Sequence, residues 1–348
     1  MEGISQMRSF FRLALSCLGL LAVGCLASAE VRYRLVPIYG HPGDVFVGAM
    51  GLNDNGDVVG VAGPNGRSDA FIFRGGVMTF LTRPQGASYV QANAISDSGM
   101  IVGWSDNSSY QGLRWDSSGN LIYSGSDPIE NINYQGHFCG FRYSSPYNYG
   151  YVSDGNSITG FGPGSGVPRA INNNDLTVGV YYDSALQANE VYFWNQGIIT
   201  YAPLLEGCSQ VSPRAVNDLG DAVGACWGNS TPTKACLWHN QQPFPLPGLP
   251  GPTRSEATGI NNRNEIVGDS TDTTTQIQSA WIYRNGVTTD LNRLTDGLGR
   301  QHILVATAIN QRGWITVEVD PGAGSTSRIG GLLIPVNRLP LPGPTVSH

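Results

Sequence analysis

The chain has 348 residues, of which 46 are glycine and 21 are proline, and only 13% are charged. Because 41% of the residues are hydrophobic, the composition is that of a turn-rich folded protein and excludes a disordered chain. The formal charge is −6 with no basic stripe, so we expect no nucleic-acid partner. After residue 30 no apolar stretch is long enough to cross a membrane, so no transmembrane segment is expected.

The N-terminus has the pattern of a secretory signal peptide. A basic start precedes an apolar run over residues 13–23, and Ala27-Ser28-Ala29 is a small-residue cleavage site. We expect residues 1–29 to be removed after Ala29 and the mature protein to be secreted, extracellular or periplasmic, from a bacterial cell. A second interpretation is a lipoprotein box that ends at Cys25 and provides a lipid anchor. This box lacks the usual Leu three residues before the cysteine, so simple secretion is favoured.

One sequence pattern then recurs seven times. Each copy has a small or polar residue, an aliphatic residue and Asn, then three turn residues and a hydrophobic stretch that ends in Val-Gly. The copies are centred on Asn53, Ser96, Asn133, Asn172, Asn217, Asn261 and Asn310. Their intervals of 37 to 49 residues are typical of β-propeller blades or of a solenoid.

The position three residues after this Asn holds only residue types that tolerate positive φ. They are Gly56, Gly99, Gly136, Asp175, Gly220, Asn264 and Gly313. Such residues predict a tight hairpin, whose backbone the Asn side chain is able to bond. The position seven after the Asn is glycine in six copies and Val317 in the last.

A variable loop and a second hairpin follow, so each unit supplies four antiparallel strands. The first strand of the second hairpin ends on a large aromatic residue in five units. These residues are Phe73, Trp115, Trp194, Trp238 and Tyr283. Large side chains at one register of the repeat predict packing between neighbouring blades.

The seventh unit is short and supplies three strands, whereas the N-terminus supplies one unpaired strand over residues 31–37. Joining the two completes a blade, closes a ring and covers open strand edges. We therefore predict an all-β fold, a single seven-bladed β-propeller over residues 30–337 with four antiparallel strands per blade. The N-terminal strand joins the C-terminal blade to close the ring, and residues 338–348 form a Pro-rich tail.

This closure also predicts the two faces of the ring. With the N-terminal strand outermost, the Asn-bearing strands line the central channel, and the Asn turns share one face. The variable loops after Val-Gly then share the opposite face, called the loop face below.

The repeat resembles that of the bacterial extracellular HAF-repeat family, whose units read approximately A-x-A-I-N-D-x-G-x-I-V-G, a spacer and H-A-F-L-Y/W. Residues 92–103 and 257–268 match the first part, and residues 69–73 and 279–283 match the second. The resemblance implies an extracellular β-propeller-like repeat protein without an established activity. The His of this motif is replaced in the first six units by Asp69, Gln111, Tyr149, Glu190, Lys234 and Ser279, so no functional residue is carried over.

Four cysteines remain after cleavage, and export permits a disulfide. Cys226 and Cys236 flank the variable loop of the fifth unit on strands that we expect to be neighbours, which predicts a disulfide between them. Cys208 precedes the same unit and is an alternative partner for Cys226. Cys139 occupies a position that is Val in other units and is expected to pack as a small hydrophobe.

The loop face of units two to four is rich in aromatic and polar side chains, which suit stacking on sugars or contact with a partner protein. The candidate ligand-binding residues there are Trp104, Phe141, Arg142, Tyr143, Tyr147, Tyr181 and Tyr182, with Tyr110, Tyr149 and Asp183 nearby. Arg169 and Arg214 precede the inner strands of adjacent units. They either hold an anionic group or pair with Glu130 and the loop acids.

No catalytic motif is found, and the catalytic residues, if any, stay unknown. The acidic turn residues fit hairpins better than a calcium loop, and the histidines lack metal-ligand spacing, so no metal and no cofactor are expected. The leading hypothesis is an exported binding or interaction scaffold for an extracellular glycan or protein. The alternative is a carbohydrate-active enzyme, a hydrolase or lyase, on the loop face. A surface-layer or matrix component, lipidated at Cys25, is a third.

Overall fold

The structure is a computed structural model. It describes residues 30–336 except 65, 107–109, 145–146, 162–165, 252 and 323–326. The expected signal peptide, Cys25 and the Pro-rich tail lie outside the described residues. Residues 31–336 belong to one structural unit.

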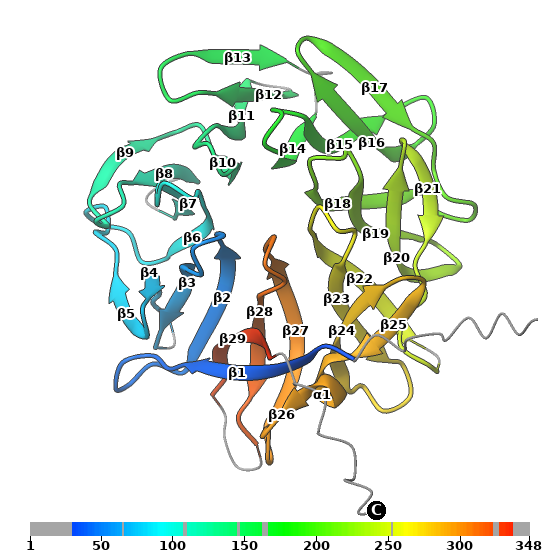
Figure 1. The fold of residues 1–348 in the computed structure, drawn as a ribbon. Coiled ribbons are helices and arrows are strands. Elements are labelled where there is room, and N and C mark those ends of the chain that lie inside the picture. Colours follow the sequence, from blue (N-terminus) through cyan, green and yellow to red (C-terminus); the bar gives the residue numbers. More distant parts are fainter. Residues whose placement is uncertain are drawn as a thin grey trace, which may run out of the picture. The chain divides into compact units, whose positions relative to one another are not determined.

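The strands of this unit form seven antiparallel sheets, or blades, around a central axis (Figure 1). Blades 1 to 3 consist of β2 (Phe46–Leu52), β3 (Val58–Gly63), β4 (Asp69–Arg74) and β5 (Val77–Phe80); β6 (Val90–Ile95), β7 (Ile101–Ser105), β8 (Gln111–Trp115) and β9 (Leu121–Gly125); and β10 (Ile129–Ile132), β11 (Phe138–Ser144), β12 (Tyr147–Ser153) and β13 (Ile158–Phe161). Blades 4 to 6 consist of β14 (Val167–Ile171), β15 (Thr177–Asp183), β16 (Ala188–Asn195) and β17 (Ile198–Ala202); β18 (Gln210–Val216), β19 (Ala222–Gly228), β20 (Thr231–His239) and β21 (Gln242–Pro245); and β22 (Thr253–Ile260), β23 (Ile266–Asp272), β24 (Gln278–Arg284) and β25 (Val287–Asp290).

Blade 7 is assembled from both ends of the chain, as predicted. Its strands are β27 (His302–Ile309), β28 (Ile315–Asp320), β29 (Ile329–Val336) and β1 (Arg32–Ile38), in that order from the channel outwards. In Figure 1 the blue β1 lies beside the red β29, with which it pairs antiparallel along its whole length. The short β26 (Thr295–Asp296) adds a parallel pair outside β1. The seven-bladed β-propeller closed by the N-terminal strand is therefore confirmed.

One turn of helix, α1 (Leu291–Leu294), departs from the all-β prediction. It follows β25, and Asp290 caps it by accepting a hydrogen bond from the backbone N–H of Asn292. Leu291 and Leu294 are buried against the last blade, so the helix covers the connection to blade 7.

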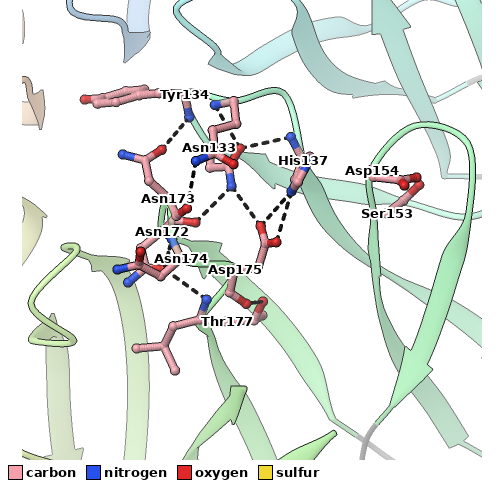
Figure 2. Close-up of polar contacts among 12 residues, drawn as sticks. Asn133, Tyr134, His137, Ser153, Asp154, Asn172, Asn173, Asn174, Asp175 and Thr177 are labelled. Atoms are coloured by element: carbon pink, nitrogen blue, oxygen red, sulfur yellow. Dashed lines mark hydrogen bonds and ion pairs between the residues drawn. The ribbon is translucent and has the colours of Figure 1, made fainter. Parts of the chain in front are cut away.

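Each repeat Asn makes hydrogen bonds in two directions. The Oδ1 atom of Asn172 accepts from the backbone N–H groups of Asn174 and Leu176, at 2.9 Å each, and so fixes its own turn. Its Nδ2 atom donates to the carbonyl oxygen of Asn217 in the next blade at 2.8 Å. Figure 2 shows the same link from Asn133 to Asn172 between blades 3 and 4.

These cross-blade links continue around the channel. The donors are Asn53, Asn133, Asn172, Asn217, Asn261 and Asn310, and Asn310 closes the ring by donating to the Asn53 carbonyl at 2.9 Å. The predicted positive φ is present in every turn, including 60° at Asp175 and 55° at Asn264.

Ser96 leaves one gap in this ring, between blades 2 and 3. Its shorter side chain stays within its own turn, where Oγ accepts from the backbone N–H of Met100 at 3.0 Å. At this level the blades are joined instead by a backbone bond from Asp97 to the Tyr134 carbonyl, at 3.3 Å. We call the contact between these two blades the 2/3 seam.

The recurring aromatic residues pack between blades. Trp115 of blade 2 is fully buried in one cluster with Ile72 of blade 1, and Trp238 of blade 5 is buried in one cluster with Phe193 of blade 4. At both seams an apolar residue on the third strand of one blade thus shares a cluster with the recurring aromatic residue on the third strand of the next.

The predicted cysteine pair lies on neighbouring strands. Cys226 on β19 and Cys236 on β20 are buried free thiols whose Sγ atoms are 2.9 Å apart, whereas a disulfide joins them at about 2.05 Å. Cys208 is partly buried in the same cluster. The disulfide therefore stays a prediction. Cys139 is fully buried, and burial raises the pKa of its thiol.

We expect Asn172→Ala to reduce the free energy of unfolding by about 2–4 kcal/mol, because it leaves a carbonyl and two turn N–H groups without their partner. Asn172→Ser is expected to lose less, since Ser96 fixes the equivalent turn of blade 2. Urea denaturation measures both. Asn195→Ala, at an exposed position, is the matched control. A loss at Asn172 no larger than the control contradicts the role of the ring.

Candidate functional site

Every inner strand contains a β-bulge three residues before the repeat Asn. In blade 4 the pairing register shifts between Pro168 and Ala170, so Arg169 is the bulged residue. A bulge re-aims the side chain of the extra residue. The bulged residues of the seven blades are Met50, Asn93, Glu130, Arg169, Arg214, Thr258 and Thr307.

In six blades the glycine that follows Val in the repeat lies against this bulge, whereas blade 7 has the same bulge opposite Val317. A Cβ atom at Gly179 would lie 2.4 Å from the Val167 carbonyl oxygen, and one at Gly103 would lie 1.9 Å from that of Gln91. A side chain there would displace the inner strand, so glycine marks a close approach of two backbones.

All seven bulged side chains line one cavity of about 620 Å³, the channel mouth, at the loop-face end of the channel. Its charges are largely paired. Arg169 donates to Glu130 at 3.1 Å, and Arg214 lies 3.5 Å from Glu256. Burial raises the pKa of Glu130, and the Arg169 charge opposes this shift. The remaining lining is rich in amide and hydroxyl groups, which bind neutral polar ligands.

Two carboxylates stand side by side at the channel mouth. Glu256 on β22 is the cross-strand partner of Asp269 on β23, and Gln278 donates to Asp269 Oδ2 at 2.9 Å. Burial, with the charges of Glu256 and Glu318, raises the pKa of Asp269 to about 6, against the lowering effects of the Gln278 hydrogen bond and the Arg214 charge. Asp269 therefore takes up a proton more readily than an ordinary aspartate.

A second cavity of about 650 Å³, the aromatic pocket, lies beside the channel mouth over blades 2 to 4. Its lining residues are Tyr110, Ser126, Asp127, Pro128, Glu130, Phe141, Tyr143, Asn148, Val167 and Arg169. Because Glu130 and Arg169 also line the channel mouth, their ion pair forms the wall common to both cavities.

Successive side chains of β11 point to opposite faces of the sheet, which separates the predicted binding residues on this strand. Phe141 and Tyr143 are two residues apart and share the face that lines the pocket, whereas Arg142 points the other way and forms an ion pair with Asp127 at 2.6 Å. Tyr110 stacks on Trp104 with ring centroids 4.8 Å apart. The Tyr143 side chain is 67% exposed, so the pocket has an open aromatic rim.

The structure thus brings Phe141, Tyr143 and Arg169 together in the pocket lining, and Trp104 contacts the pocket residue Tyr110. Tyr181 and Tyr182 lie on β15 outside the pocket lining, and Tyr181 contacts the ring of Tyr201 instead. Of the other predicted residues, Arg214 lines the channel mouth. The side chain of Tyr147 lies outside the described residues.

Sequence reasoning missed Asp127, Asn148, Glu256 and Asp269. The seven bulged residues could have been found from the sequence. The position three residues before the Asn varies from Met to Glu to Arg, whereas the positions beside it repeat. Asp127 lies in the connection between blades 2 and 3, and Asn148 lies at the start of β12 opposite Tyr143, and neither position belongs to the repeat motif.

Tyr134 obstructs the opposite end of the channel. It follows a repeat Asn, and its hydroxyl is hydrogen-bonded to Gln311 of blade 7. Burial raises the pKa of Tyr134, and the charges of Asp54, Asp97 and Asp218 from three other blades raise it further. The ring therefore reaches across the channel, and the cavity at this end measures about 200 Å³.

Within the described parts of residues 30–336, no group of three or more His, Cys, Asp or Glu is placed to hold a metal ion. In the same residues, no helix has the length and apolar character needed to cross a bilayer.

No protein-family model matches the sequence, and no curated protein does. Among solved structures, the β-propeller domain of the Trilobed protease from Pyrococcus furiosus is similar with a TM-score of 0.55 and 10% identity, over 70% of this chain and 81% of that one. A streptogramin B lyase is similar with a TM-score of 0.50 and 11% identity, over 86% of this chain and 97% of that one.

The Pyrococcus horikoshii acylaminoacyl peptidase gives a TM-score of 0.54 at 13% identity, over 79% of this chain and 49% of that one. The chain thus spans about half the length of that peptidase. At such low identity these likenesses show the propeller fold alone.

We expect the free energy of unfolding to depend on pH through Asp269. Its pKa of about 6 in the folded state exceeds the unfolded value of 3.8, so the folded protein binds this proton more readily. Its contribution therefore stabilises the fold as pH falls from about 6 to 4 and is lost as pH rises. Asp269→Asn removes this dependence and is expected to be more stable than the native chain at pH 7 by about 1–3 kcal/mol.

Urea denaturation between pH 4.5 and 7.5 measures the difference. Glu206→Gln, an exposed carboxylate, is the control and should leave the dependence unchanged. Parallel curves for Asp269→Asn and the native protein contradict the shift.

Proposed function

We propose that the protein is an exported, non-enzymatic propeller that binds carbohydrate in the aromatic pocket of its loop face. The observation that carries this proposal is the combination of Tyr110, Phe141 and Tyr143 with polar groups in one cavity of about 650 Å³. A cavity of this size matches a small-molecule site.

The chemistry of the pocket fits a sugar. Aromatic faces stack on the C–H face of a pyranose. The Asn148 amide donates hydrogen bonds to sugar hydroxyls and accepts them, and the Asp127 and Glu130 carboxylates accept them. The Arg169–Glu130 pair is neutral overall, which favours a neutral sugar over an anion. A concave site suits a glycan better than a globular protein partner.

The channel mouth extends this site. Its amide and hydroxyl lining, which includes Asn93, Asn131 and Thr307, continues from the shared Arg169–Glu130 wall. A chain of several sugars therefore has polar contacts beyond the ring that stacks in the aromatic pocket.

A carbohydrate-active enzyme is the second candidate, and one observation favours it. Asp269, with its raised pKa of about 6, stands opposite Glu256 at the channel mouth, and paired carboxylates of unequal pKa are what acid–base cleavage of a glycosidic bond requires.

Glycan-array screening with the purified protein tests the proposal, and titration calorimetry quantifies each hit. We expect Tyr110→Ala and Tyr143→Ala each to weaken binding about tenfold or more, because each removes a stacking face. Phe244→Ala, an exposed aromatic residue on β21, should bind as the native protein does.

Absence of any bound glycan, or an equal loss in the Phe244 control, contradicts the proposed site. Cleavage of a bound glycan that Asp269→Asn abolishes while binding persists establishes the enzyme instead.

Export and the cysteine pair are tested together. The repeat resembles extracellular HAF repeats, and we propose that the chain is exported, cut after Ala29 and oxidised at Cys226 and Cys236. An intact-mass spectrum of protein from the producing cells should show a chain that begins at Glu30, is lighter by two hydrogen atoms than the fully reduced chain, and has Cys208 free. A lipid-modified N-terminus at Cys25 contradicts simple secretion, and a free thiol at Cys226 contradicts the pairing.

A further inference from the structure

Two departures from the repeat meet at the 2/3 seam. The residue just before the recurring aromatic position of the third strand is Ile72, Val152, Phe193, Leu237 or Ile282 in five blades. In blade 2 this residue is Arg114. The residue that follows it is aromatic in five of the first six blades, but in blade 3 it is Ser153. At the seams 1/2, 3/4, 4/5 and 5/6 an apolar side chain shares a cluster with an aromatic ring, whereas this seam brings Arg114 toward Ser153.

These smaller and polar residues leave a cavity of about 190 Å³, the seam pocket. It is lined by Arg114 and Tyr123 of blade 2 and by Phe138, Ser153 and Asn156 of blade 3, with Asp127 from the connection between them. The Ser153 side chain is buried, and its Oγ accepts from the backbone N–H of Gly155, so its own proton remains available.

Arg114 has no acidic partner among the described residues. Its guanidinium lies over the ring of Phe138, 4.8 Å from the centroid, and its buried Nε has no hydrogen-bond partner. Asp127 is the acid that lines the pocket, but Arg142 holds its Oδ2 atom from Nη2 at 2.6 Å and from Nε at 3.0 Å. The pocket thus contains one uncompensated positive charge, which is costly in a partly buried site.

We propose that the seam pocket binds a small oxyanion, namely a carboxylate, sulfate or phosphate group. The forked guanidinium donates paired hydrogen bonds to such a planar or tetrahedral anion, the Ser153 hydroxyl donates another, and Phe138 fixes the plane of the fork. The anion neutralises Arg114 and joins blades 2 and 3 at the seam that lacks the Asn link. This site is independent of carbohydrate binding in the aromatic pocket.

The test is thermal unfolding of the full chain in rising sodium acetate, sodium sulfate and sodium phosphate, with sodium chloride holding the ionic strength constant. We expect a saturable rise in Tm with at least one oxyanion and none with chloride. A response to acetate alone assigns a carboxylate, and a response to sulfate or phosphate assigns a tetrahedral anion.

Two variants remove the site in different ways, and each introduces a residue that another blade has at the equivalent position. Arg114→Leu copies Leu237 of blade 5, and Ser153→Phe fills the pocket as Phe73 does in blade 1 while leaving the arginine in place. Both should lose the oxyanion response, whereas Arg34→Leu, at an exposed position on β1, should keep it.

If one variant fails to fold, the other decides. No saturable response in the native protein, or a native-like response in every folded variant, overturns the proposal.

Discussion

The amide of the repeat Asn is the interaction on which the ring depends. One side chain closes its own hairpin through Oδ1 and reaches the next blade through Nδ2, so local turn and global closure use the same residue. Asn310 makes the same link across the junction of the two chain ends, where its Nδ2 atom donates to the Asn53 carbonyl. Because the donor and acceptor are buried, each link is costly to leave unmade.

The same constraint explains where the blades are free to differ. The Asn turns occupy one end of the channel and Tyr134 reaches across it, so variation there disturbs the ring. At the other end the bulge presents one side chain per blade to the channel mouth, without altering the strand pairing on either side. At the 2/3 seam three positions depart from the repeat, namely Ser96, Arg114 and Ser153. Both the seam pocket and the aromatic pocket lie beside this seam.

The propeller was predictable because turn chemistry is local. Positive-φ residues and the Asn recur at fixed spacing, and the missing fourth strand of the last unit pointed to closure by the N-terminus. The site was predictable only in part. Strand alternation turns Arg142 away from Phe141, and the residues after Gly179 continue along β15 rather than over the pocket, so neighbours in sequence were separated in space.

The β-bulge of the inner strands could have been recognised from the sequence. In six blades the glycine of Val-Gly lies close to a carbonyl oxygen of the inner strand at its kink, and blade 7 has the same kink opposite Val317. The charges at the channel mouth follow from that kink. By contrast, the pairing of Glu256 with Asp269 depends on a cross-strand register that no sequence motif specifies.

The Asn links rigidify six of the seven seams between blades, and we propose that function is concentrated near the 2/3 seam, which has no such link. Native-state hydrogen exchange measured by mass spectrometry tests this directly. Backbone amides of residues 94–100 and 129–138 should exchange faster than their equivalents in the other blades, and should be protected when a ligand occupies a pocket beside the 2/3 seam. Uniform exchange around the ring, or ligand protection confined to blades 5 to 7, contradicts it.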